Sequence, residues 1–121
     1  MHGVIALACV AGLAALGCAT PAPLRPAALT TAEAAIAAAA EAGAAELAAE
    51  PLSLAREKLA LADESVAKGM PTRASRLAEQ ARVDALLSRA LSEKARADRQ
   101  LAETRRLDAK IRREAESALE P

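Results

Sequence analysis

The chain has 121 residues, which allows one domain at most on the usual prior of about 100 to 200 residues per domain. Its 16 basic and 16 acidic residues cancel to a formal net charge of zero, so no overall field attracts nucleic acid. It contains no Phe, Tyr or Trp, and therefore lacks the rings on which single-stranded nucleic acids stack. The composition predicts no nucleic-acid partner.

The amino-acid mixture also predicts an all-α fold with a thin core. Hydrophobic residues make up 53% of the chain, but more than half of them are alanine, which buries little area. Alanine, leucine, arginine and glutamate are strong helix formers, and they dominate the sequence. Burial must therefore come from the Leu, Val and Ile side chains.

An uncharged apolar run, Gly3 to Leu16, opens the chain. Its length suits the central region of a signal peptide and falls short of the roughly 20 residues of a membrane-spanning helix. We therefore predict that residues 1–17 are a signal peptide. Two alternatives stay open: an ordinary secretory signal followed by an incidental cysteine, and a buried apolar N-terminal helix.

The end of this run, Ala14-Ala15-Leu16-Gly17-Cys18, resembles the lipobox of bacterial lipoproteins. The resemblance implies cleavage between Gly17 and Cys18 by signal peptidase II and attachment of lipid to Cys18. Cys9 has only eight residues before it, so we assign it to the removed signal. Ala19 follows the lipidated cysteine where an aspartate would signal retention in enterobacterial lipoproteins. This likeness implies a lipid anchor in the outer membrane of a Gram-negative cell envelope, facing the periplasm.

A proline-rich tether is predicted after the cysteine, over residues 18–29. Its stretch ATPAPLRPAA holds three prolines in ten residues, which favours an extended chain. A helical domain should follow over residues 30–121. Thr30 and Glu33 have the spacing of a capping box, which predicts a first helix over about 30–48. Its apolar stripe would be Ile36, Ala40, Gly43 and Leu47, with Gly43 weakening the helix or ending it early.

A second helix is predicted over about 51–68, because Pro51 suits a first helical turn. Gly69 should close it in a left-handed conformation. Since only Met70 separates Gly69 from Pro71, a third helix over about 71–119 must fold back as an antiparallel hairpin. The predicted stripe of the second helix is Leu52, Ala55, Leu59, Ala62 and Val66, widened by Leu54 and Leu61.

The third helix is longer than the helices it can pack against. Its first half carries the apolar side chains Leu77, Val83, Leu86, Leu87 and Leu91. Its second half is highly charged, and we expect it to project as an overhang or to pair with another chain. Pairs such as Asp108 with Arg112, and Glu103 with Arg106, would support a solvated helix.

One candidate interaction face is readable on this second half. A seam through Val83, Leu87 and Ala90 continues to Leu101 and Ile111, but polar residues interrupt it, so self-association should be weak. A basic patch whose charge suits anionic headgroups or an acidic partner consists of Arg105, Arg106, Arg112 and Arg113. Ordinary helix surface is the alternative interpretation of both features.

The blocks AEAAIAAAAEAGAAEL, LAREKLALADESVAKG and RASRLAEQARVDALLSRA, with the tether and the Gly69 turn, resemble the bacterial family known as domain of unknown function 4398. The likeness covers about Thr30 to Leu107. It implies a helical, lipoprotein-linked protein, and in some members the domain precedes a peptidoglycan-binding domain. No such domain lies within these 121 residues, so cell-wall binding is not carried over. The resemblance transfers no catalytic residue.

Motifs for chemistry are scarce. The only histidine, His2, lies in the predicted signal, and no metal or cofactor site is readable. Asp63 and Glu64 diverge by about 100 degrees on a helix and cannot converge on one substrate. We therefore expect a non-enzymatic envelope lipoprotein, anchored by lipid, that acts as a helical structural or protein-interaction module without a small-molecule substrate. The alternative is an accessory or adaptor subunit of an envelope enzyme or transporter.

Overall fold

The computed structural model of the chain describes residues 24–120, and this part is all-helical without a strand. The predicted signal peptide, Gly17, Cys18 and the first residues of the tether lie outside it. The helices are α1 (Ala27–Glu41), α2 (Ala44–Leu47), α3 (Ala49–Ala67) and α4 (Pro71–Leu119). The predicted all-α fold with a long C-terminal helix is confirmed.

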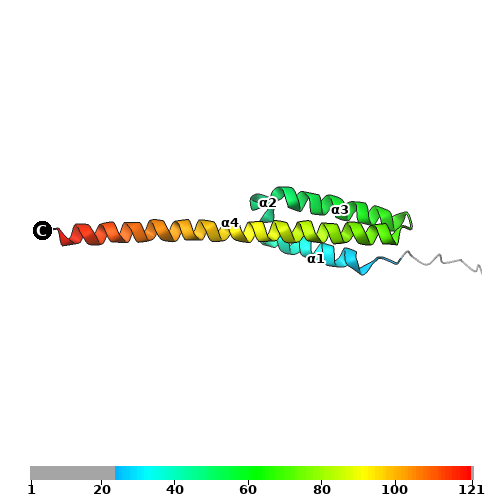
Figure 1. Cartoon of the computed structure of the whole chain (residues 1–121), viewed down its shortest axis with the longest axis horizontal. Helices are drawn as coiled ribbons and strands as arrows, with labels where there is room; N and C mark the ends of the chain where they lie inside the picture. Colours follow the sequence, from blue (N-terminus) through cyan, green and yellow to red (C-terminus); the bar gives the residue numbers. More distant parts are fainter. Residues whose placement is uncertain (1–23, 121) are drawn as a thin grey trace, which may run out of the picture.

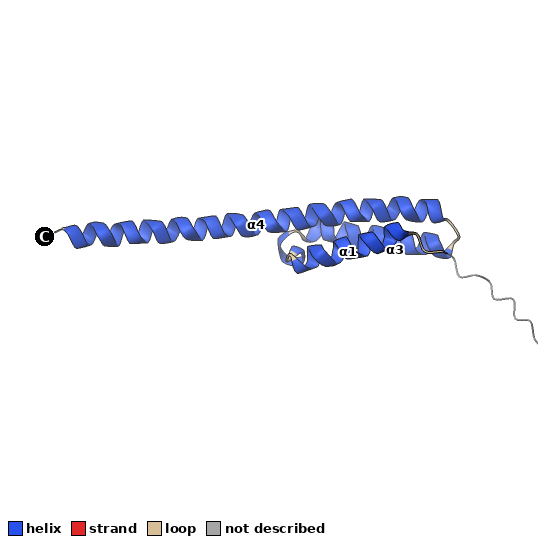
Figure 2. Cartoon of the chain, turned by 90° about the horizontal axis from the view of Figure 1, so that it is seen from below, coloured by secondary structure: helices blue, strands red, loops and turns tan. Residues whose placement is uncertain are grey.

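The helix α4 is the axis of the molecule. Both α1 and α3 pack against it, and they lie on the same side of it (Figure 2). Leu29 near the start of α1 packs with Ala74 and Ala78 near the start of α4, so these two helices run parallel. The C-terminal half of α4 extends alone beyond the other helices (Figure 1). The predicted overhang is therefore present.

The turn from α3 to α4 forms as predicted. Gly69 has a φ of 70°, in the left-handed region that a residue with a Cβ rarely adopts. The Gly69 N–H donates to the Val66 carbonyl at 2.9 Å, and the Met70 N–H donates to the Ser65 carbonyl at 2.8 Å. These two bonds define a Schellman motif, which ends α3 and turns the chain directly into Pro71.

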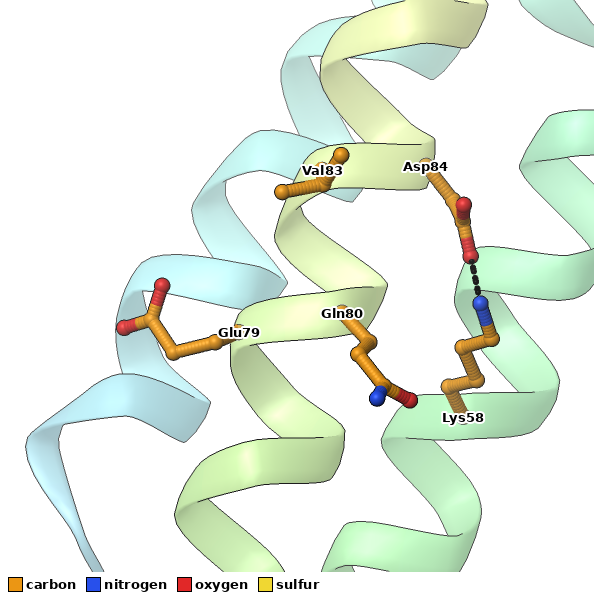
Figure 3. Close-up of a pocket in the computed structure, with 5 residues that line it drawn as sticks. All are labelled: Lys58, Glu79, Gln80, Val83 and Asp84. Carbon is orange, nitrogen blue, oxygen red and sulfur yellow. Dashed lines mark hydrogen bonds and ion pairs between the residues drawn. The ribbon is translucent and has the colours of Figure 1, made fainter.

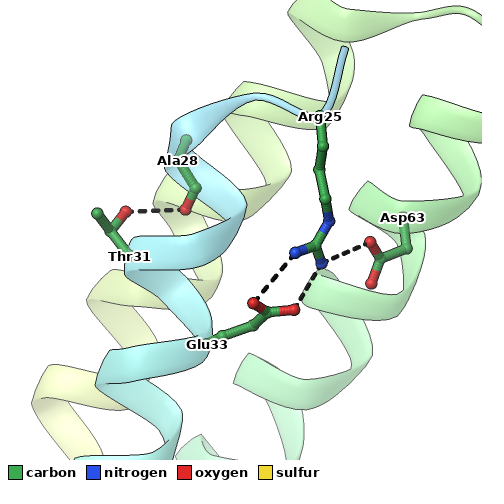
Figure 4. Close-up of polar contacts among 5 residues, drawn as sticks. All are labelled: Arg25, Ala28, Thr31, Glu33 and Asp63. Carbon is green, nitrogen blue, oxygen red and sulfur yellow. Dashed lines mark hydrogen bonds and ion pairs between the residues drawn. The ribbon is translucent and has the colours of Figure 1, made fainter. Parts of the chain in front are cut away.

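The start of α1 differs from the prediction. The helix begins at Ala27, after Pro26, and Thr30 caps nothing. Thr31 lies within the helix, where its hydroxyl donates to the Ala28 carbonyl at 2.8 Å (Figure 4). The reason is Leu29, which lies in the predicted tether segment but is fully buried against the bundle. Burying a leucine contributes about 1.5 to 3 kcal/mol, more than the roughly 1 kcal/mol of a good N-cap.

The predicted helix over 30–48 is broken twice. Gly43, with a φ of 81°, ends α1 early as expected. A second break at Ala48, whose φ and ψ are −152° and 52°, was not predicted. The Ala48 carbonyl accepts a buried hydrogen bond of 2.8 Å from the Ser88 hydroxyl of α4. This contact between distant segments fixes the break, and no local pattern announces it.

The core consists mainly of small side chains. Two adjoining clusters are formed, one around Ile36 and Leu52 and the other around Leu29. Leu59 is half-buried and packs against both. The buried residues of α4 contain no side chain larger than serine: they are Ala74, Ala78, Ala81, Ala85, Ser88 and Ser92. Helices that meet through such residues can approach closely.

Several residues predicted to lie in the core are exposed. Leu54 and Leu61 on α3 are exposed, although Leu52, Ala55 and Ala62 are buried as predicted. Ala40 on α1 is exposed, and the buried stripe of that helix is Leu29, Ala32, Ile36 and Ala39. On α4, the larger side chains face solvent because the alanine side faces the bundle; those exposed are Val83, Leu86, Leu87 and Leu91.

Leu52 provides a direct test of the core. Its side chain is 1% exposed, so Leu52→Ala should lower the free energy of unfolding by about 2 to 5 kcal/mol through lost burial and a residual cavity. Leu54→Ala is the matched control on the same helix, where the side chain is 43% exposed. Thermal unfolding followed by circular dichroism measures both. Equal melting temperatures for the two variants would contradict this assignment of the core.

Candidate functional site

The described residues hold no group of His, Cys, Asp and Glu side chains that could bind a metal ion. Surface depressions are shallow: the one over Gln80 and Val83 has a volume of about 500 Å³ and opens to solvent. Lys58 and Asp84 at its edge form a 2.6 Å ion pair that links α3 to α4 (Figure 3). The remaining charged residue that lines the depression, Glu79, pairs with Arg82 of its own helix.

No helix within residues 24–120 has both the length and the hydropathy needed to cross a membrane.

An ion-pair cluster joins the N-terminal segment to the bundle. The Arg25 guanidinium donates to Glu33 of α1 at 3.1 Å and to Asp63 of α3 at 2.9 Å (Figure 4). These hydrogen bonds hold the pKa of Glu33 below its ordinary value and raise the pKa of Arg25. Glu64, beside Asp63, pairs instead with Lys68, so the two carboxylates diverge. The cluster therefore fastens residue 25 to α1 and α3.

The overhang, residues 96–119 of α4, carries the residues of the predicted interaction face. Every residue from 96 to 120 is exposed, including Leu101 at 50% and Ile111 at 54%. Arg105 and Arg112 are two turns apart and line one shallow depression with Asp108. Since successive helix residues turn by about 100 degrees, Arg106 and Arg113 continue the side on which Ala85 and Ser92 are buried. The four arginines therefore do not form one patch.

The two charge pairs expected in the overhang are wrong. Neither Glu103 with Arg106 nor Asp108 with Arg112 forms an ion pair. Within the described residues, Lys110 pairs with Glu114 of the overhang at 3.7 Å, and Lys94, just before the overhang, pairs with Asp98 at 2.6 Å. Both join a lysine to an acid four residues later, a spacing that brings two side chains together on one helix face.

A feature only partly recognised from sequence is a continuous outer face on α4. We define the outer face as the seam opposite the buried alanines, occupied by residues 83, 87, 90, 94, 97, 101, 104, 108, 111, 115 and 118. It runs along the bundle as well as the overhang, and α1 and α3 leave it uncovered (Figure 2). The heptad spacing predicts this seam, whereas the hairpin prediction places Val83 and Leu87 in the core between the helices. Both residues are exposed, so they belong to the outer face and not to the core of the hairpin.

A sequence profile described as Domain of unknown function (DUF4398) matches residues 27–104. The match begins at the first residue of α1 and ends within the overhang. No curated protein and no solved structure gives a significant match.

Replacing Arg25 tests the cluster at the N-terminal end. In Arg25→Gln the pKa of Glu33 should rise toward its ordinary 4.5, because its charged donor is lost. The stabilisation by this carboxylate is present above its unfolded pKa and disappears as pH falls through the lower folded pKa, so the variant should lose stability near neutral pH and not in strong acid. Side-chain carboxyl NMR titration measures the pKa.

Lys68→Gln is the matched control, because it should raise the pKa of Glu64 and leave that of Glu33 unchanged. An unaltered Glu33 titration in Arg25→Gln would show that the cluster does not persist in solution.

Proposed function

This chain belongs to the family described as Domain of unknown function (DUF4398), and we propose that it is a non-enzymatic lipoprotein of the Gram-negative cell envelope. In this proposal lipid on Cys18 anchors the chain, most simply to the outer membrane, and the helical domain serves as a structural or protein-interaction module in the periplasm. Support for the anchor comes from the sequence Ala14-Ala15-Leu16-Gly17-Cys18 and the proline-rich segment after it.

The observation that carries the interaction role is the overhang. A 49-residue helix packs over its first half and leaves the rest in solvent, with exposed Leu101 and Ile111. Such a projection contributes nothing to the core of the bundle, whereas it offers a long surface to another protein. Four large apolar side chains are exposed on this half of the helix, Leu101, Leu107, Ile111 and Leu119, and they offer another protein an apolar surface to contact.

The placement of the two ends agrees with this role. Arg25 binds Asp63 near the C-terminal end of α3, at the end of the bundle where the chain turns into α4. The overhang leaves from the opposite end (Figure 1). A chain anchored through its N-terminus would therefore direct the overhang away from its point of attachment.

Partners decide between the proposed module and an adaptor subunit of an envelope enzyme or transporter. Affinity purification of the full chain from detergent-solubilised membranes should recover the chain itself or a non-catalytic envelope protein. Recovery of an enzyme or transporter in stoichiometric amount would support the adaptor role instead. In either case Leu101→Gln should reduce the amount of partner recovered, because the partner binds at the overhang.

The anchor is tested at the two cysteines. Cys18→Ser should abolish metabolic labelling with palmitate and release the protein from the membrane fraction, because the lipid chains attach through this residue. Cys9→Ser is the matched control and should leave both unchanged, since Cys9 lies in the segment that is removed. Persistent labelling of Cys18→Ser would refute the proposed lipoprotein.

A further inference from the structure

The exposed apolar residues of α4 are not scattered. With positions a and d of a heptad repeat assigned to the outer face, all of its exposed large apolar residues fall on a, d or the flanking e and g positions: Val83, Leu86, Leu87, Leu91, Leu101, Leu107, Ile111 and Leu119. None falls on b, c or f, where the buried alanines and serines of the bundle lie. This distribution is that of a coiled-coil strand whose partner is missing.

Charges along the outer face indicate which partner and which direction. Lys94 and Asp108 both lie on the seam, one seven residues before Leu101 and the other seven residues after it. In an antiparallel pair each a residue packs in a layer with a d residue of the partner. A second copy running antiparallel, with Leu101 opposite Thr104, therefore places Lys94 of each chain next to Asp108 of the other, on the same side of the interface. A parallel copy in register would instead place Lys94 against Lys94 and Asp108 against Asp108, which is repulsive.

Flanking charges agree with the same direction. In an antiparallel pair the e positions of one chain lie beside the e positions of the other. Asp98 and Arg105 are both at e positions, so Asp98 of each copy approaches Arg105 of the other, once on each side of the centre. In a parallel pair g meets e, and Glu93 would face Asp98. Within residues 24–120, neither Arg105 nor Asp108 has an ion-pair partner in its own chain. Both are therefore available to a second copy.

We propose that two copies of this chain associate antiparallel through the outer face of α4, with the Leu101 side chains of the two copies on either side of the two-fold axis. The inference deepens the proposed interaction role by naming its partner. In this register Ala115 and Ala118 of one overhang lie opposite Ala90 and Leu87 of the other copy. Each overhang thus covers the exposed apolar strip on the bundle half of its partner, a strip that α1 and α3 leave open.

The apolar centre is tested with the full chain in detergent. Analytical ultracentrifugation should detect a reversible monomer–dimer equilibrium, and Leu101→Gln should raise the dissociation constant at least about tenfold, as expected for a buried central position. Ala102→Gln is the matched control: it adds the same side chain one residue along, on the side away from the seam, and should leave the constant unchanged. A wild-type chain that stays monomeric, or equal effects of both variants, would overturn the proposal.

Charge reversal tests the direction. Lys94→Glu and Asp108→Lys should each weaken the dimer by about tenfold, because two-fold symmetry converts two attractive contacts into two repulsive ones. The double variant should restore the wild-type dissociation constant. Parallel pairing predicts no such rescue, since like charges face one another in every variant. Failure of the double variant to recover would therefore overturn the antiparallel arrangement.

Two reversals off the seam serve as controls. Lys110→Glu is the control for Lys94→Glu, because each change breaks an ion pair with an acid four residues later. Glu103→Lys is the control for Asp108→Lys, because each change replaces an acid with a lysine. Neither should change the dissociation constant. These measurements do not depend on lipid at Cys18, so failure of the dimer and failure of the proposed anchor are distinguishable.

Discussion

Close packing of small side chains on α4 against α1 and α3 is the constraint on which the rest of the structure depends. Alanine adds little buried area, yet it loses no side-chain entropy on folding and lets two helix backbones approach. The few larger buried side chains, Leu29, Leu52 and Ile36, come from α1 and α3 and pack against the alanines of α4. A chain without aromatic residues obtains a core in this way.

The same constraint explains what sequence could and could not predict. Helix content, the Gly69 turn and the overhang follow from local signals: propensity, a left-handed glycine before Pro71, and a charged sequence without Gly or Pro. The phase of α4 did not follow, because leucines were expected to mark the buried side and alanines mark it instead. Likewise Leu29 follows the proline-rich segment in the sequence and has no local signal of burial. Its packing against Ala74 and Ala78 of α4 explains why it belongs to α1.

The candidate surface was recognised in part for a related reason. Leu101 and Ile111 stand out among charged neighbours, so their exposure could be anticipated. Val83 and Leu87 could be assigned either to the hairpin core or to an outer seam, and only the packing of α1 and α3 on the other side of α4 separates these alternatives. Arginine residues close in sequence looked like a patch, but helical geometry places Arg106 and Arg105 on different sides.

The parallel course of α1 and α4 has a consequence for how such a protein would sit on a lipid surface. Both helices start at the same end, so the N-terminal end of α1 lies beside residue 71. In the proposed antiparallel pair the N-terminal ends of the two copies would lie at opposite ends of the assembly, about 60 helical residues or about 90 Å apart at roughly 1.5 Å per residue. With both anchors in a single leaflet, the pair would lie parallel to the membrane surface. With its anchors in two facing bilayers, it would set the width of the gap between them.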